Sequence, residues 1–225
     1  MGKEYIREML QSGEAHHIGS IHYTENFESG ITWEHDGNAG NYLVDWNKDE
    51  ALMGKYSAHM QTRTVGAALD DWVSIENPIY LPYNKRLSVW TFFRVPYFLT
   101  CEYLEWQLTW YDGTTVHYAT FFYDPVAEIW QYADSSGVTQ NITGSDQALY
   151  PDTWHKVKFS IDFEADEYLE LWCNTMRVDM RGIALETDTS GVAENFWIVL
   201  YATASAVGYT DIYIDDMMVT EYGIE

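Results

Sequence analysis

Two stretches of the chain alternate apolar side chains with polar and aromatic ones. In 101–111 the apolar set is Leu and Trp, and in 168–174 it is Leu and Cys. Because strand residues alternate between two faces, the polar and aromatic residues of each stretch share a second face, opposite the apolar one. Cys101 and Tyr168 are also predicted to lie on this second face. A binding site that combines aromatic rings with a few polar groups suits a sugar, which offers a ring to stack on and hydroxyls to bind. The candidate platform for such a ligand is Tyr103, Glu105, Gln107, Glu170, Trp172 and Asn174.

Two more residues extend this platform if their strands belong to the same sheet. They are His117, in the run 115–123, and Tyr201, in the run 196–203. The other interpretation is that this second face is covered, either by an N-terminal arm or by another subunit, and that its aromatic residues simply pack. Aromatic residues make up 16% of the chain, more than the core of one sandwich needs, and both interpretations stay open.

Most of the chain is predicted to form β-strands, because runs of period two are separated by Gly, Pro, Asn and Asp. The clearest runs are Leu87–Val95, Cys101–Tyr111, Thr115–Tyr123, Glu128–Ala133, His155–Phe163, Tyr168–Asn174, Phe196–Thr203 and Asp211–Tyr222. Two hairpins are predicted, with turns at Asp112-Gly113 and at 164–167. Many strands without helical patterns between them predict an all-β fold, an antiparallel two-sheet β-sandwich.

The N-terminal residues differ from the rest. Apolar side chains recur at helical spacing between Tyr5 and Leu10, and Gly13 supplies a stop. We find no internal repeat and no low-complexity linker. The sequence therefore predicts a short N-terminal helix and arm over residues 1–22, followed by a single sandwich domain over residues 23–225.

Several segments resemble those of known jelly-roll proteins. Thr24–Trp33 resembles the opening of calcium-containing jelly-roll carbohydrate-binding modules, and Ile212–Val219 resembles their last strand. Asp152–Asp162 followed by Tyr168–Asn174 is similar to the Trp-His-x-Val-x-Phe-x-Ile hairpin of concanavalin A-like lectin and glucanase jelly rolls. The resemblance covers most of residues 24–222. It implies a jelly roll of the concanavalin A-like or galactose-binding-like type, and it supports the fold better than an activity.

In the modules that the chain resembles, the first and last strands lie side by side, and an acidic residue from each binds a structural calcium ion. Glu28 and either Asp215 or Asp216 match those positions. Calcium takes several oxygen ligands at about 2.3–2.6 Å, so carboxylates from both ends of the chain would hold the sandwich closed. The resemblance thus implies calcium at Glu28, Asp215 and Asp216, and no other cofactor. The alternative is that these residues are solvated strand ends in an acidic protein.

The catalytic pattern of the jelly-roll glucanases is absent. Their catalytic acids alternate along one strand, whereas here the acidic residues of 164–167 lie in a predicted turn and Leu169 stands at the third matching position. Glycoside hydrolysis needs two carboxylates about 5–10 Å apart, and a Glu105–Glu170 pair on neighbouring strands is the remaining candidate. A glycoside hydrolase or polysaccharide lyase is therefore the least favoured function.

The charge of the chain excludes several partners. It has 35 acidic and 12 basic side chains, which gives a formal net charge of −23. Such a chain repels nucleic acid and anionic membrane surfaces. No apolar stretch is long enough to cross a membrane, and the first residues lack the apolar stretch of a signal peptide. We therefore expect cytoplasmic synthesis, with a virion as one destination that fits.

These observations favour a non-catalytic module that recognises a glycan through the aromatic and polar face. The alternative is a structural protein of an assembly, such as a virion decoration, tail or fibre protein, which uses the jelly roll for contacts with its own copies or with other subunits. A glycan platform predicts that Trp172 and Tyr103 are exposed in a monomer. An assembly role predicts a homo-oligomer or larger complex in which they are buried between chains.

Overall fold

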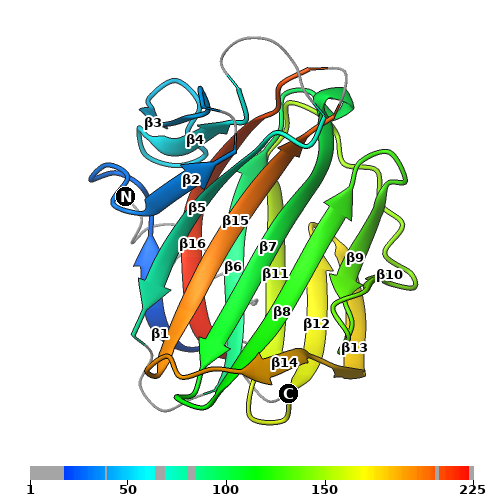
Figure 1. The fold of residues 1–225 in the computed structure, drawn as a ribbon. Coiled ribbons are helices and arrows are strands. Elements are labelled where there is room, and N and C mark those ends of the chain that lie inside the picture. Colours follow the sequence, from blue (N-terminus) through cyan, green and yellow to red (C-terminus); the bar gives the residue numbers. More distant parts are fainter. Residues whose placement is uncertain (1–17, 39, 64–68, 81–84, 206–207, 223–225) are drawn as a thin grey trace.

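Two antiparallel sheets pack face to face in the protein (Figure 1). The computed structural model describes residues 18–38, 40–63, 69–80, 85–205 and 208–222. Sheet A has the strand order β13-β12-β11-β6-β16-β4-β3, with β1 paired to β16. Sheet B has the order β10-β9-β8-β7-β15-β5-β2, with β14 paired to β8. The predicted two-sheet β-sandwich is confirmed.

The strands have the following bounds. Sheet A contains β1 (Ile18–Glu25), β3 (Leu43–Asn47), β4 (Ser57–Gln61), β6 (Arg86–Arg94), β11 (His155–Asp162), β12 (Glu167–Cys173), β13 (Met176–Ala184) and β16 (Asp211–Tyr222). Sheet B contains β2 (Glu34–Gly37), β5 (Trp72–Ile79), β7 (Cys101–Tyr111), β8 (Thr115–Asp124), β9 (Ile129–Ala133), β10 (Thr139–Asn141), β14 (Glu186–Thr189) and β15 (Asn195–Ala204). A short 3₁₀ helix, η2 (Phe98–Thr100), precedes β7.

Both predicted hairpins are present. The turn between β7 and β8 contains Gly113 with a φ of 95°, and the Asp112 carboxylate accepts hydrogen bonds from the backbone N–H groups of Thr114 and Thr115. The turn between β11 and β12 contains Asp166 with a φ of 54°. Both positions use the left-handed region that Gly and Asp tolerate best. The turn residues therefore fix which strands are neighbours.

The short helix predicted between Tyr5 and Leu10 lies outside the described residues. The division into an arm and one domain at residue 23 stays a prediction. Among the described segments, none is a helix with the length and apolar character that crossing a bilayer requires.

Aromatic rings fill the space between the sheets. Trp106 of β7 lies 5.0 Å from Phe93 of β6, 5.4 Å from Phe159 of β11 and 5.4 Å from Trp130 of β9, measured between ring centroids. All four side chains are buried. Because these rings come from both sheets, the core rigidly sets the relation between the two outer faces.

The alternation predicted from the sequence fails at two positions. Cys101 and Tyr168 were predicted to face away from the core, and both are buried. The pairing of β12 shifts register after Tyr168, and that of β15 shifts near Cys101, so a simple period of two does not hold there. The Tyr168 hydroxyl accepts from the backbone N–H of Thr120 at 3.1 Å and donates to the carbonyl of Ala133 at 2.8 Å. Tyr168 is thus a core residue that also binds the backbone of the opposite sheet.

A histidine connects three strands of sheet A. His59 of β4 lies 2.9 Å from Asp45 of β3 through Nδ1 and 2.9 Å from Asp211 of β16 through Nε2. Its ring also stacks on Tyr213 at 4.6 Å. Burial alone lowers the pKa of His59, but the hydrogen bond to Asp211 and the negative charge of Asp45 outweigh it and raise the pKa above its ordinary value.

We expect His59 to stabilise the fold mainly below neutral pH. A group whose pKa is raised on folding contributes fully below its unfolded pKa, about 6.5, and the contribution is lost as the pH rises through the folded value. His59→Gln is therefore expected to lower the free energy of unfolding by about 1–2 kcal/mol at pH 6 and by less at pH 9. Urea unfolding of both proteins across this range measures the difference. A difference that does not vary with pH contradicts the ionic role.

Candidate functional site

The outer face of sheet B holds part of the predicted platform. Tyr103, Glu105 and Gln107 lie on β7, and the residues between them, Leu104 and Trp106, are buried in the core. Because successive strand residues point to opposite sides, the three predicted residues lie on the outer face. All three are partly exposed. A ligand in solution can therefore reach them.

Tyr201 of β15 joins this group. It lies opposite Glu105 of β7 on one side and opposite Ser74 of β5 on the other. Glu105 in turn lies opposite Phe122 of β8. The strands do share a sheet, which was the condition for Tyr201 to extend the platform. The register brings together residues more than 120 positions apart in the chain, Ser74 and Tyr201.

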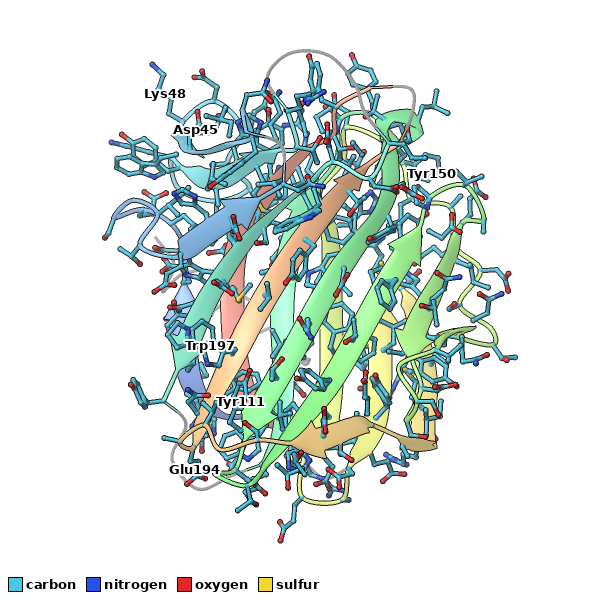
Figure 2. All side chains as sticks on the ribbon, viewed as in Figure 1. Asp45, Lys48, Tyr111, Tyr150, Glu194 and Trp197 are labelled. Atoms are coloured by element: carbon cyan, nitrogen blue, oxygen red, sulfur yellow. The ribbon has the colours of Figure 1, made fainter. Side chains whose placement is uncertain are left out.

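Six partly exposed aromatic side chains lie on the same face as Glu105, two of them, Tyr201 and Phe122, directly opposite it. They are Trp72, Tyr103, Tyr118, Phe122, Trp197 and Tyr201. The rings of Trp72 and Tyr201 lie 5.7 Å apart in an edge-to-face arrangement, and those of Tyr103 and Phe122 lie 6.0 Å apart. Figure 2 labels Trp197, which lies on β15 four residues before Tyr201. Flat rings spread over several strands suit a ligand that is extended rather than a single small molecule.

Four of these rings, Trp72, Tyr118, Phe122 and Trp197, were not predicted from the sequence. Tyr118 and Phe122 have the strand parity opposite to that of His117, the residue of β8 that was predicted instead. Trp197 has the same strand parity as Tyr201, so the alternation within Phe196–Thr203 was enough to find it. Trp72 begins β5, which carries Pro78 and was not recognised as a strand. The signal for Trp72 was therefore present only in the sheet pairing.

The carboxylate of Glu105 is the unusual polar group of this face. Burial raises its pKa to about 7. No described residue donates a hydrogen bond or forms an ion pair with it. Burial also raises the pKa of Tyr201 to about 12, with a further contribution from the charge of Glu105. An unpaired carboxylate between aromatic rings is costly in the free protein and is available to a ligand that donates hydrogen bonds.

Glu170 and Trp172 do not share this face. They lie on β12 of sheet A, and the neighbouring Leu171 and Cys173 are buried in the core. The two predicted residues therefore lie on the outer face of sheet A, and the prediction of one continuous platform is wrong for β12. It follows that Glu105 and Glu170 lie on opposite sides of the sandwich, which removes the candidate catalytic pair.

Glu170 belongs to a buried ion pair. Lys158 Nζ lies 2.9 Å from Glu170 Oε2, and the two side chains are 3% and 4% exposed. Lys158 also lies over the rings of Trp172, at 4.6 Å, and Trp90, at 5.1 Å, and Arg177 binds the same carboxylate. Burial alone raises the pKa of Glu170, but the hydrogen bond and charge of Lys158 outweigh it and lower the pKa. These residues form a packed structural cluster.

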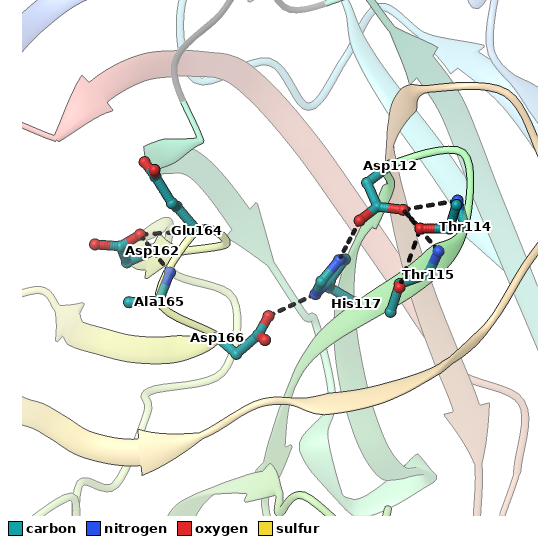
Figure 3. A network of polar contacts seen from close by, with 8 residues as sticks. All are labelled: Asp112, Thr114, Thr115, His117, Asp162, Glu164, Ala165 and Asp166. Carbon is teal, nitrogen blue, oxygen red and sulfur yellow. Dashed lines mark hydrogen bonds and ion pairs between the residues drawn. The ribbon is translucent and has the colours of Figure 1, made fainter.

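His117 lies at one end of the sandwich, not on the outer face of sheet B (Figure 3). Its Nδ1 lies 2.5 Å from Asp166 in the β11–β12 turn, and its Nε2 lies 3.5 Å from Asp112 in the β7–β8 turn. Backbone hydrogen bonds from Thr115 and Thr114 lower the pKa of Asp112. His117 therefore connects a turn of sheet A to a turn of sheet B, and the prediction that it extends the platform is wrong.

Asn174 is also in a turn. It follows β12 with a φ of 52°, its Oδ1 accepts from the backbone N–H of Lys156 at 3.1 Å, and its Nδ2 donates to His155 Nδ1 at 3.0 Å. These bonds join the β12–β13 turn to the first residues of β11 in sheet A. Asn174 is therefore separated from the outer face of sheet B.

The three residues predicted to bind calcium have different environments. Asp215 accepts hydrogen bonds from the backbone N–H groups of Leu52, Met53 and Asp216 at 2.8–3.1 Å. Its oxygens are therefore occupied by the chain, and burial, with the neighbouring charge of Asp216, raises its pKa to about 7. The structural role of Asp215 is to hold the connection between β3 and β4 against β16.

Glu28 and Asp216 fit a cation better. Burial and the nearby charge of Glu28 raise the pKa of Asp216 to about 6. Asp216 Oδ2 is buried and accepts no hydrogen bond from a described residue. Glu28 Oε1 accepts from the backbone N–H groups of Lys55 and Tyr56 at 2.7 and 3.0 Å. Within the described ranges, no group of three or more His, Cys, Asp or Glu side chains is arranged for a metal. Further ligands would therefore be backbone oxygens or water.

No model of a protein family matches the sequence, and no curated protein matches it. Solved structures do match. The cellulose induced protein Cip1 has a TM-score of 0.60 at 14% identity, over 90% of this chain and 100% of that one. The alginate lyase Aly36B has a TM-score of 0.52 at 12% identity, over 92% and 99%. A sialidase has a TM-score of 0.53 at 13% identity, over 91% of this chain but only 19% of the sialidase. At such identities the likeness shows a shared β-sandwich fold.

Proposed function

We propose that the protein binds a carbohydrate chain on the outer face of sheet B. The observation that supports this is a set of six partly exposed aromatic rings along the face that carries the unpaired carboxylate of Glu105, with Tyr201 and Phe122 directly opposite it. Rings stack on the faces of sugars, while Glu105 and Gln107 accept and donate hydrogen bonds to hydroxyl groups. The names of two structures with this fold, an alginate lyase and a sialidase, also state carbohydrate substrates.

The site is proposed to bind without catalysis. Leu169 replaces one acid of the glucanase pattern, and the candidate pair of Glu105 and Glu170 is split between the two sheets. Tyr201 and Trp197 are four residues apart on β15, a span of about 13 Å along a strand. A ligand that contacts both must be an oligosaccharide or polymer, and each single contact is weak.

Affinity electrophoresis tests this function. The protein is run through native gels that contain neutral, amino or acidic polysaccharides, and Tyr201→Ala is run beside it. We expect at least one polysaccharide to retard the protein and to retard the variant less. Retardation by none of them contradicts the proposal. Incubation of the protein with the retarding polysaccharide, followed by an assay for new chain ends, tests for catalysis, and new ends would show that the protein is an enzyme.

We also propose that Glu28 and Asp216 hold a structural calcium ion between the first and last strands. The ion would supply positive charge beside the Asp216 carboxylate, whose pKa is raised by burial and by the nearby charge of Glu28. Glu28 and Asp216 come from opposite ends of the sequence, so their shared ligand stabilises the folded state only.

Removal of calcium is expected to lower the melting temperature. A ligand present at a hundredfold excess over its Kd adds about 2.7 kcal/mol to the free energy of unfolding. For a domain of this size that corresponds to a rise of about 5–10 °C in the melting temperature. Thermal melting with a chelator and with excess calcium measures the shift, and Asp216→Asn is expected to abolish it. An unchanged melting temperature under both conditions contradicts the site.

A further inference from the structure

The two sheets differ completely in their content of basic residues. The eight strands of sheet B contain neither Lys nor Arg. Those of sheet A contain Arg86, Arg94, Lys156, Lys158, Arg177 and Arg181. The connections hold four more basic residues, one of which, Arg63, is paired with Asp71 at 3.1 Å. The remaining two, Lys3 and Arg7, lie outside the described residues. The proposed ligand face therefore has no Lys or Arg in any of its strands.

Carboxylates lie on this same face. Asp36 of β2 lies opposite Ser74 of β5, in the cross-strand row of Tyr201 and Glu105. Glu34 lies opposite Glu76, in the next row on the same face, which ends at Gln107. Burial raises the pKa of Glu76, and the charges of Glu34 and Asp36 add to this effect. Among the described residues, no Lys or Arg forms an ion pair with any of these four carboxylates. Their repulsion is therefore uncompensated within the sheet.

We infer that this face selects its carbohydrate by charge, binding amino-sugar chains most tightly, neutral chains less tightly and acidic chains not at all. The inference rests on the proposed function. A protonated amine would pair with Glu76 or Glu105. At Glu105 it would also lie beside the opposite ring of Tyr201, where cation–π attraction adds to the charge pairing. A uronic acid or sulfated chain would bring a further negative charge to a face that has no cation for it.

The distribution of charge also bears on the structural matches. A site for a polyuronate needs basic or other donor groups that hold carboxylates, and Arg is the side chain best suited to that task. The strands of sheet B contain neither Arg nor Lys. The substrate named for the alginate lyase is therefore the class that this face rejects.

A matched series of oligosaccharides tests the inference. Hexamers of β-1,4-linked glucosamine, glucose and glucuronic acid share one backbone. Relative to glucose, each glucosamine unit carries an amine at C2 and each glucuronic acid unit carries a carboxylate at C6. Isothermal titration of the full chain at about pH 7, where the Glu105 carboxyl with its pKa of about 7 is about half ionised, is expected to give the glucosamine hexamer about tenfold tighter binding than the glucose hexamer, as two or three partly exposed charge pairs provide. The advantage should shrink in about 1 M NaCl, because salt screens exposed charges. No heat is expected from the glucuronate hexamer.

Non-specific attraction to an acidic protein is separated by a charge-matched control. Glu76→Gln/Glu105→Gln removes two charges from the face, whereas Asp49→Asn/Glu164→Gln removes two exposed charges from the connections of sheet A. The first variant is expected to lose the preference for glucosamine over glucose, and the second to retain it. Equal loss in both variants overturns the inference.

Two other results also overturn it. Binding of the glucuronate hexamer as tightly as the glucose hexamer removes the charge selection but leaves the proposed function in place. Binding of none of the three hexamers contradicts the inference for this backbone, and the polysaccharide gels then decide whether the proposed function survives.

Discussion

Replacing Glu170 with alanine is expected to lower the free energy of unfolding by about 3–5 kcal/mol, or the melting temperature by about 10 °C. The reason is the burial of Lys158, whose ammonium group lies 2.9 Å from the Glu170 carboxylate with only 3% of its side chain exposed. Loss of the carboxylate leaves that charge in a site with little water. The rings of Trp90 and Trp172 compensate only part of the cost.

A double variant serves as the control for this prediction. Lys158→Met/Glu170→Leu replaces both charges with apolar groups of similar volume, and such replacements of buried pairs are often close to neutral. We expect it to recover most of the stability lost in Glu170→Ala when both are unfolded in urea. If the double variant is as unstable as the single one, the loss comes from packing rather than from removal of the Glu170 charge beside Lys158.

The second large effect is expected on binding. Tyr201 lies between Ser74 and Glu105 at the centre of the aromatic face and contacts the ring of Trp72. Central, partly buried Tyr and Trp residues carry most of the energy of many interfaces, at about 2 kcal/mol or more each. Tyr201→Ala is therefore expected to weaken binding of the polysaccharide that retards the protein in the gels about thirtyfold. Because Trp72 shares its contact, Trp72→Ala/Tyr201→Ala should lose less than the sum of the two single changes.

Trp172→Ala is the matched control for that experiment. It removes a partly exposed aromatic ring from the other sheet, where Trp172 packs on Lys158 and Arg177. Titration with the same polysaccharide should give an unchanged Kd, although the protein is expected to be less stable. A large loss of binding in Trp172→Ala, with Tyr201→Ala unaffected, would place the ligand on sheet A and contradict the proposed site.

The sequence predicted the local strand pattern better than the pairing of strands. Period two correctly separated Tyr103, Glu105 and Gln107 from Leu104 and Trp106, because burial of one face imposes that period. The same period placed Glu170 and Trp172 on one face with Tyr103, Glu105 and Gln107, which is wrong. A strand has the same alternation in either sheet, so the period does not show to which sheet it belongs. Pairing depends on contacts distant in sequence, such as Tyr201 with Ser74, which no local pattern contains.

The other errors have local causes. The pairing of β12 shifts register after Tyr168, so Tyr168 does not follow the alternation of the residues after it. For this reason Tyr168 was predicted on the surface, whereas it is buried in the core. His117 has the parity of the core residues Ala119 and Phe121, and two turn carboxylates bind it near the end of β8. The alternation within β8 therefore already excluded His117 from the outer face, and the prediction went wrong because it followed the residue type instead of the parity.

The pairing of β1 with β16 has a practical consequence for handling the protein. Ile18 lies opposite Tyr222, so both ends of the described chain emerge side by side from sheet A (Figure 1). A label or solid support joined at either position is attached to the sheet that does not carry Tyr201 and Trp72. Molecules immobilised in this way would share one point of attachment, on a strand pair of sheet A, and the outer face of sheet B would stay open to a ligand in solution.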